Sequence, residues 1–347
     1  MRKIAVVGTG LMGTSFGLHV QSFYNDVYLL GYDKDPKQSE NALKIGAFSR
    51  IVDSLTELKG CEFIFVCCPL KYASETIERL FEIVDESTII TDISSVKSQI
   101  CKRFADKKNF LGGHPMTGSE RQGALAAQAE IFDNSLYILC PEINQELSCK
   151  KIQIFLEKMN IKIYKMKPSI HDRVVAMASH LPYFVATTLV NSMDGELFEH
   201  ISSVAGSGFR DTSRVASSPG KMWDIISKEN SENILEAINI FKERLDETTV
   251  SIKKENTLDI SDKAKRLRDS IVENRLAGSG ESMLTIDVPD RPGVLSNIFN
   301  LLENINIKNI EIEDSREYST GSLRVFFRTT EDKKKAEHLL KNSDIFN

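Results

Sequence analysis

The chain has 347 residues, of which 41% are hydrophobic and 27% are charged, and this is enough for two or three globular domains. A formal net charge of -5 provides no basic surface for nucleic acid or an anionic membrane, so neither is expected as a partner. The first residues run directly into a strand pattern, and no apolar run approaches the roughly 18 residues that span a bilayer. We therefore expect a cytoplasmic protein.

The six cysteines contain no Cys-x-x-Cys pair and are scattered through predicted strands and helices. They are expected to be reduced thiols, because this pattern indicates neither a zinc site nor a disulfide framework. No cluster of histidine, cysteine and acidic residues has a spacing that would bind another metal.

A strand predicted over residues 3–7 runs into a glycine-rich turn. The turn has the pattern GxGxxG, formed by Gly8, Thr9, Gly10, Leu11, Met12 and Gly13. In a dinucleotide-binding (Rossmann) motif, the first glycine allows a tight turn, the second lets a pyrophosphate approach the backbone, and the third lets the next helix pack on the strand. That helix offers its N-terminal N–H groups to the phosphates. Strand, turn and helix together favour a dinucleotide site over a structural turn.

The second predicted strand, Val27 to Tyr32, ends beside an acidic residue, Asp33. A carboxylate at this position accepts hydrogen bonds from a ribose 2′-hydroxyl and repels a 2′-phosphate. We therefore expect NAD as the cofactor rather than NADP, with Lys34 as a weak signal in the opposite direction.

Strands and helices alternate up to residue 167, which predicts an α/β domain with a doubly wound sheet over residues 1–167. Further strands are predicted over 62–67, 88–91, 109–111, 135–140 and 161–164, and helices over 71–83, 97–104 and 146–158. Ligands of such sheets lie at the carboxyl ends of the strands, which points to Cys67 and Pro69 for the cofactor and to the segment from Asp92 to Lys97. Ser95 in that segment is a site candidate, with helix N-cap as the alternative role.

The segment Leu111 to Glu120 reads LGGHPMTGSE and is predicted to be a glycine-flanked turn. Within it, His114 precedes Pro115, which places an imidazole on a constrained loop that is open to close approach. Such a residue suits proton transfer, although a single loop histidine is more often a surface or packing residue. The nucleotide-binding signature before it, and the histidine and arginine segments after it, favour the functional interpretation.

After residue 167 the pattern becomes helical, which predicts an all-α second domain over residues 168–276. Ser179 and Tyr183 lie four residues apart, so they present two hydroxyls on one helix face. His180 lies at helical spacing from apolar residues, so a packing role is favoured for it over a role in the site.

A glycine-rich break in the helical segment carries Arg210, Asp211 and Arg214. The planar fork of an arginine suits a substrate carboxylate, so one of the two arginines is a candidate anchor. The alternative is a solvated pair with Asp211, which contributes little. From Ser231 to Asn274 one or two long amphipathic helices are predicted, and they favour a homodimer interface.

The last segment, residues 283–347, follows a linker predicted over Ala277 to Ser282 and has the pattern of a small α+β module. The predicted order is strand, helix, two strands of a hairpin and helix, with a few residues left for a short last strand. No catalytic constellation is present in this segment, so we expect a binding or pairing module.

Taken together, the motifs make the chain resemble the prephenate dehydrogenases of tyrosine biosynthesis that carry a C-terminal ACT domain. The resemblance covers nearly the whole chain and rests on six motifs in the expected order: GTGLMG, DISSVK, GGHPMTGSE, SHLPY, FRDTSR and DRPGVL. Enzymes of this family transfer a hydride to NAD from the ring carbon that bears the 4-hydroxyl of prephenate, and they release the ring carboxylate as CO₂. The products are 4-hydroxyphenylpyruvate and NADH.

The resemblance implies roles for individual residues. His114 matches the catalytic histidine, which holds the 4-hydroxyl and accepts its proton, and Ser95 matches a serine that steadies this hydroxyl. The residues that it places in the substrate pocket are Arg214, as the anchor of the ring carboxylate, with Asp211, Glu120, Ser179 and Tyr183. Tyr183 stands where family members often have a histidine, which bears on the choice between prephenate and arogenate.

In ACT domains, the loop between the first strand and the first helix helps to bind an amino acid. In this chain the loop contains Asp290, Pro292, Gly293, Val294 and Leu295. The resemblance implies L-tyrosine, the end product, as the effector. The last strand of the domain is expected to be short or missing.

Three other functions remain compatible with the sequence. An arogenate dehydrogenase has the same fold and reaction, on a substrate with an amino group in place of the keto group. A different β-hydroxyacid-type dehydrogenase is expected to use a lysine base in the helical domain. A non-catalytic sensor of NAD and an amino acid would have no reason to keep His114, Ser95 and Arg214 together.

Overall fold

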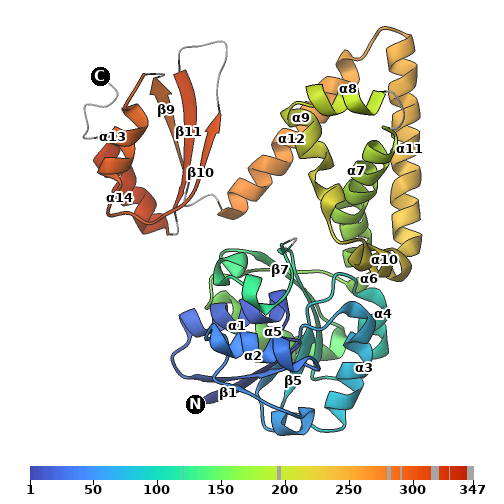
Figure 1. Ribbon diagram of the computed structural model, residues 1–347, viewed down its shortest axis with the longest axis vertical. Coiled ribbons are helices and arrows are strands. Elements are labelled where there is room, and N and C mark those ends of the chain that lie inside the picture. The colour runs from blue at the N-terminus through green and yellow to red at the C-terminus, as the bar shows by residue number, and fades with distance from the viewer. Residues whose placement is uncertain are drawn as a thin grey trace. The chain divides into compact units, whose positions relative to one another are not determined.

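The computed structural model describes residues 1–119, 121–193, 197–279, 283–289, 291–313, 320–327 and 329–341. The chain divides into two compact units, Met1–Glu243 and Arg244–Asn347 (Figure 1). The first unit therefore contains the sheet domain with the larger part of the helical segment, and the second contains the small C-terminal module.

An eight-stranded sheet forms the centre of the first unit, with the strand order β3-β2-β1-β4-β5-β6-β7-β8. The strands are β1 (Arg2–Val7), β2 (Val27–Tyr32), β3 (Arg50–Ile51), β4 (Phe63–Val66), β5 (Ile89–Asp92), β6 (Phe110–Pro115), β7 (Leu136–Cys140) and β8 (Lys162–Lys165). Neighbouring strands are parallel except for β6 and β7, which are antiparallel. With crossovers to both sides of β1, this is the predicted doubly wound sheet.

Helices cover both faces of the sheet (Figure 1). They are α1 (Leu11–Phe23), α2 (Pro36–Lys44) and α5 (Glu146–Glu157) on one face, and α3 (Leu70–Phe81) and α4 (Ser98–Arg103) on the other. Short 3₁₀ turns join them: η1 (Leu55–Leu58), η2 (Ala124–Ala126), η3 (Ala129–Phe132) and η4 (Ile143–Gln145). Because side chains alternate along a strand, Ile4 and Val6 of β1 enter the core beneath α1, whereas Ala5 and Val7 enter the core beneath α3.

The segment that carries His114 is a strand, β6, and not the predicted turn. The two glycines before His114 are required by packing. A Cβ atom at Gly112 would lie 2.4 Å from Sγ of Cys101, and a Cβ atom at Gly113 would lie 2.6 Å from the carbonyl oxygen of Asp92. The prediction of a glycine-flanked loop is therefore wrong, because glycine within a strand also serves the close approach of neighbouring groups.

The rest of the first unit is helical, as predicted. It contains α6 (Pro168–Val175), α7 (Leu181–Asn191), α8 (Leu197–Val204), α9 (Ser207–Ser213), η6 (Arg214–Ser217), α10 (Gly220–Glu229) and the first part of α11 (Ser231–Lys253). A π-helical turn, η5 (Ala176–His180), joins α6 to α7, and in it the N–H of Leu181 bonds to the carbonyl of Ala176, five residues back. Pro182 accounts for this turn, because proline offers no N–H for the regular helical bond.

The continuous helix Pro168–Asn191 is long and apolar enough to cross a bilayer by length and composition alone. The sequence pattern predicted no such run. However, this helix carries His171 and Asp172, whose side chains are 0% and 1% exposed, and Asp172 bonds to the backbone of Lys97 in the sheet domain. A buried polar pair with partners in the neighbouring domain is typical of a core helix.

The C-terminal module is a three-stranded antiparallel sheet, in the order β10-β11-β9, with two helices packed against it. Its elements are β9 (Met283–Pro289), α13 (Val294–Leu301), β10 (Ile307–Glu313), β11 (Thr320–Phe327) and α14 (Thr330–Lys341). The predicted order of strands and helices is confirmed, and the expected last strand lies outside the described residues. Helix α12 (Leu258–Ser279) includes Ala277 to Ser279, so the prediction of a linker over these three residues is wrong, and the remaining linker residues lie outside the described ranges.

Candidate active site

The glycine turn after β1 has the geometry that a dinucleotide phosphate requires. Gly8 has a φ of +101°, and a Cβ atom there would lie 2.5 Å from the backbone nitrogen of Cys68. A Cβ atom at Gly13 would lie 1.9 Å from the carbonyl oxygen of Gly8, so α1 packs this closely only with glycine. Gly10 faces open space, with no atom within 4 Å of such a Cβ. As the N-cap of α1 without a side-chain cap, it leaves N–H groups for a phosphate.

Asp33, at the end of β2, is tied to the glycine turn. Its Oδ2 accepts a hydrogen bond from the N–H of Thr9 (2.7 Å), and its Oδ1 accepts one from the N–H of Asp35 (3.0 Å). Two backbone donors thus hold the carboxylate beside the phosphate turn. The Nζ of Lys34 lies 4.1 Å from the centre of the Tyr72 ring, so this charge rests over an aromatic face.

The other predicted cofactor residues lie in this turn, at the start of α1 or directly after β4. Thr9 is fully buried, its hydroxyl lies 3.3 Å from that of Ser39, and its N–H and carbonyl bond to Asp33 and Thr14, so it braces the turn. Leu11 and Met12 begin α1 and are partly buried. Cys67 follows β4, and burial raises the pKa of its thiol well above the ordinary value, so it is a neutral group. Pro69 is exposed at the start of α3.

The loop after β5 contains a fully buried ion pair. The Nζ of Lys97 contacts the carboxylate of Asp92, and both side chains are 0% exposed. The same carboxylate accepts hydrogen bonds from the N–H of Gly113 (3.2 Å) and of Ser94 (3.0 Å). Asp92 therefore ties this loop to strand β6 immediately before His114.

His114 belongs to a chain of side chains that no motif predicted. Its Nδ1 lies 2.8 Å from Nε2 of His171 in α6, and Nδ1 of His171 lies 2.8 Å from Oδ1 of Asp172. His171 and Asp172 are buried, whereas His114 is partly exposed, so a substrate can reach only His114. The sequence did contain a signal, because a His-Asp pair within an apolar helical pattern requires partners if it is buried.

Helix α4 is not capped by Ser95. Its N-cap is Lys97, which makes no side-chain cap. Instead, Asp172 of α6 accepts hydrogen bonds from the N–H groups of Lys97 and Ser98, both at 2.7 Å. The alternative in which Ser95 serves as the helix cap is therefore wrong, and its partly buried hydroxyl is left for another role.

The surroundings of His114 favour the neutral imidazole. Burial lowers its pKa well below the ordinary value, and the nearby His171, Lys97 and His180 lower it further. A lowered pKa keeps a base unprotonated to lower pH, so we expect kcat/KM to fall only below about pH 6.5, the ordinary pKa of histidine. Initial rates across the pH range check this. An acid limb centred above that pH would contradict the assignment.

Aromatic packing surrounds two of the candidate residues in the helical segment. The ring of Tyr183 stacks on Trp223, with 3.9 Å between centroids and 5° between planes. His180 is 1% exposed, and its Nδ1 lies 3.2 Å from Nδ2 of Asn230, in agreement with the packing role predicted for it. Burial lowers the pKa of His180 to about 4, which keeps it neutral. Ser179 lies on the π-helical turn and is partly exposed.

Arg214 and Asp211 are exposed on the segment formed by α9 and η6, which packs against α7. No ion pair joins these two residues within the described ranges. Arg210 donates from Nη1 to the carbonyl oxygen of Ala205 (3.0 Å). Arg214 is therefore the better candidate for an anion anchor. Glu120, also predicted for the pocket, lies outside the described residues.

The predicted effector loop begins α13. Gly293 has a φ of +87° and is the N-cap of this helix, which requires the conformational freedom of glycine. Pro292 and Leu295 are exposed, whereas Val294 is buried in the core of the module. Asp290, the first residue predicted for this loop, lies outside the described residues.

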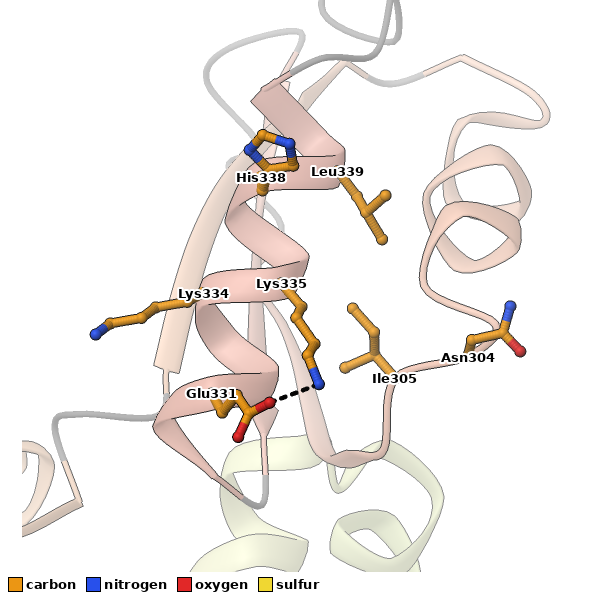
Figure 2. Close-up of a pocket in the computed structure, with 7 residues that line it drawn as sticks. All are labelled: Asn304, Ile305, Glu331, Lys334, Lys335, His338 and Leu339. Atoms are coloured by element: carbon orange, nitrogen blue, oxygen red, sulfur yellow. Dashed lines mark ion pairs between the residues drawn. The ribbon is translucent and has the colours of Figure 1, made fainter.

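A pocket of about 460 Å³ lies elsewhere in the C-terminal module (Figure 2). Its lining residues are Asn304, Ile305, Glu331, Lys334, Lys335, His338 and Leu339. Glu331 and Lys335 form an ion pair of 2.8 Å on its wall. Because Asn304 and Ile305 follow the C-terminal end of α13, this pocket is not at the predicted effector loop.

Within the described ranges, no group of three or more His, Cys, Asp or Glu side chains is arranged to hold a metal ion. All six cysteines are free thiols. That the reaction needs no metal stays a prediction.

Three family models match consecutive parts of the chain. The prephenate dehydrogenase nucleotide-binding domain matches residues 16–165, the prephenate dehydrogenase dimerization domain matches residues 167–266, and the ACT domain matches residues 282–342. Together they cover the sheet domain, the helical segment and the C-terminal module.

Similar proteins and structures agree with these models. The chain is 31% identical to a prephenate dehydrogenase of Lactococcus lactis, over 100% of this chain and 99% of that protein. It is also 31% identical to a prephenate dehydrogenase of Bacillus subtilis, over 97% of this chain and 95% of that protein. A prephenate dehydrogenase structure from A. aeolicus with hydroxyphenyl propionate and NAD+ has a TM-score of 0.71 and 27% identity, over 79% of this chain and 98% of that one. The structure of Synechocystis arogenate dehydrogenase has a TM-score of 0.67 and 29% identity, over 79% of this chain and 98% of that one.

Proposed function

The chain belongs to the prephenate dehydrogenase family, an NAD-dependent oxidoreductase family, and we propose that it converts prephenate to 4-hydroxyphenylpyruvate in tyrosine biosynthesis. The observation that carries this proposal is the position of His114. It lies on β6, the strand next to β5, and its partly exposed imidazole is held by a contact with His171 of α6. Formation of NADH from NAD and prephenate by the purified protein tests it.

In the proposed reaction, the C–H bond at the carbon bearing the 4-hydroxyl breaks, and its electron pair moves to NAD as a hydride. The hydroxyl proton passes to His114. The bond to the ring carboxylate breaks, CO₂ leaves, and the electron pair of that bond completes the aromatic ring. The phenolate oxygen formed in this way takes a proton, which returns His114 to its neutral form. A positioned general base typically contributes about 10² to 10⁴ in rate. Ser95 steadies the hydroxyl, and orientation against the nicotinamide provides the rest.

Arg214 is proposed to anchor the ring carboxylate of the substrate, with Asp211, Glu120 and Ser179 shaping the pocket. Replacing Arg214 by alanine is expected to raise KM for prephenate by roughly 10- to 100-fold, because a charge-assisted hydrogen bond contributes about 1.5–3 kcal/mol. KM for NAD should stay unchanged. Steady-state kinetics measure both constants. Arg210→Ala is the matched control, because the guanidinium of Arg210 donates to the nearby carbonyl oxygen of Ala205. Equal increases in the two KM values would refute the anchor.

Arogenate dehydrogenase is the second candidate, since a similar structure from Synechocystis has that name. The two substrates differ only in an amino or keto group on the side chain. Tyr183 favours neither, because its ring is stacked on Trp223 and only 9% exposed. Turnover of both substrates under the same conditions decides between them.

A homodimer is proposed for the assembly, because the helical segment matches a dimerization domain and its long helix α11 exposes apolar side chains. These are Leu235, Ile240, Phe241, Leu245, Val250 and Ile252. L-Tyrosine is the proposed effector of the ACT domain, in keeping with its position as the end product. A cytoplasmic location, without nucleic-acid or membrane partners, completes the proposal and is consistent with the net charge of -5.

A further inference from the structure

We propose that Asp172 and His171 are positioning residues that fix the tautomer of His114, so that its Nε2 is the atom that accepts the substrate proton. This inference rests on the proposed function, in which His114 is the base. It also assigns a second task to Asp172, which holds the loop of Ser95 in register with the base.

The first step is the direction of the hydrogen bond between Asp172 and His171. Burial alone would raise the pKa of Asp172, but hydrogen bonds from His171, Ser98 and Lys97 outweigh burial and lower it. An ionised carboxylate can only accept hydrogen bonds. Since Nδ1 of His171 lies 2.8 Å from its Oδ1, that nitrogen must carry the hydrogen and donate it.

The second step follows from the chemistry of a neutral imidazole, which has one N–H donor and one bare nitrogen. With its hydrogen on Nδ1, His171 presents a bare Nε2 to His114. The Nδ1 of His114, 2.8 Å away, must then carry a hydrogen and donate it. The remaining nitrogen of His114, Nε2, is consequently bare and able to accept a proton.

The same carboxylate joins the helical segment to the sheet domain. Its Oδ1 also accepts the N–H of Lys97, and its Oδ2 accepts the N–H of Ser98, both at 2.7 Å. These bonds fix the start of α4, three residues after Ser95. One residue, Asp172, therefore sets both the orientation of the base and the position of the loop that carries its partner hydroxyl.

The network also accommodates the charge that forms during the reaction. When Nε2 of His114 gains a proton, the imidazolium lies two hydrogen bonds from the negative charge of Asp172. The other groups facing His114 are His180 on the π-helical turn and Lys97 in the loop after β5, and the charge of Lys97 is paired with Asp92. In this cluster, Asp172 is thus the carboxylate left to balance the new positive charge.

The tautomer is directly measurable by ¹⁵N NMR with histidine-selective labelling, because the chain has only six histidines. His114 and His171 should each show a protonated Nδ1 and a bare Nε2 at neutral pH, with signals assigned from the His114→Asn and His171→Leu variants. In His171→Leu, His114 should lose this fixed state. A protonated Nε2 on His114 in the unaltered protein would overturn the proposal, whether or not prephenate is turned over.

Kinetics separate positioning from a purely structural role. We expect His171→Leu and Asp172→Asn to lower kcat by roughly 10²-fold, since a wrongly oriented tautomer disables a histidine base. Both KM values should change little. His171→Gln should recover much of this loss, because its amide oxygen can accept the bond from Nδ1 of His114.

Asn230→Ala is the matched control. Asn230 is buried in the same region and donates to the carbonyl oxygen of Asp172, with Nδ1 of His180 as a second partner, and no hydrogen bond joins it to the imidazole of His114 or His171. This variant should melt at a lower temperature and keep its kcat. Two results would make His171 and Asp172 purely structural. One is a His171→Leu variant that keeps its kcat as Asn230→Ala does, and the other is a His171→Gln variant whose kcat is no higher than that of His171→Leu. Absence of turnover in the unaltered protein would instead count against the proposed function, while the NMR result would still decide the tautomer.

Discussion

Replacing His114 by alanine is expected to lower kcat for prephenate by about 10²- to 10⁴-fold, the typical contribution of a positioned general base. The side chain is partly exposed at the end of β6, and its Nδ1 is held by His171, so its other nitrogen is the one offered to substrate. NAD affinity should not change, because the hydrogen bond of this imidazole in the described ranges is to His171 and not to the cofactor turn after β1. Steady-state rates and NAD titration by fluorescence measure both quantities.

His200→Ala provides the control for this variant, since His200 is an exposed histidine on α8 and should keep full activity. A parallel loss of NAD affinity in His114→Ala would mean that the imidazole supports the fold of the site. Unchanged kcat would remove His114 from the mechanism altogether.

Replacing Lys97 by methionine is expected to lower the free energy of unfolding by about 3–5 kcal/mol, because it leaves the buried charge of Asp92 without its partner. Both side chains are fully buried, so water cannot replace the lost ammonium group. Urea denaturation followed by the fluorescence of Trp223, the single tryptophan of the chain, measures the loss within the same unit.

The double variant Asp92→Asn, Lys97→Met tests whether charge is the cause. Removing both charges should recover a large part of the stability, because neutral side chains avoid the desolvation cost of an unpaired ion. The recovery should be incomplete, since Asp92 also accepts the N–H groups of Gly113 and Ser94. A double variant as unstable as the single one would show that packing, and not charge, decides the effect.

The sheet domain was predictable because its signals are local. The glycine turn depends on residues in immediate sequence, and the structure gives each glycine its expected reason: a positive φ at Gly8, open space at Gly10 and close packing at Gly13. The strand that carries His114 was mistaken for a turn because its glycines are required by contacts with residues that are distant in the sequence. Cys101 and Asp92 occupy the space that side chains would need.

The partners of the buried His171–Asp172 pair could not be predicted from the sequence for the same reason. His171 lies 57 positions from His114, and Asp172 lies 75 positions from Lys97, so no spacing rule connects them. The pairing exists only because α6 packs against the start of α4. Pro182 also causes the π-helical turn between α6 and α7. This turn changes the direction in which the side chains of α7 point.

The assay of NADH formation with NAD and prephenate tests the central claim most directly, run beside arogenate, with NADP in place of NAD, and with added L-tyrosine. The account predicts turnover of prephenate with NAD, slower turnover with NADP because of Asp33, and inhibition by L-tyrosine. Efficient turnover of arogenate alone would correct the substrate while keeping the site. No turnover of either substrate would contradict the assignment of His114 as the base of an oxidative decarboxylation.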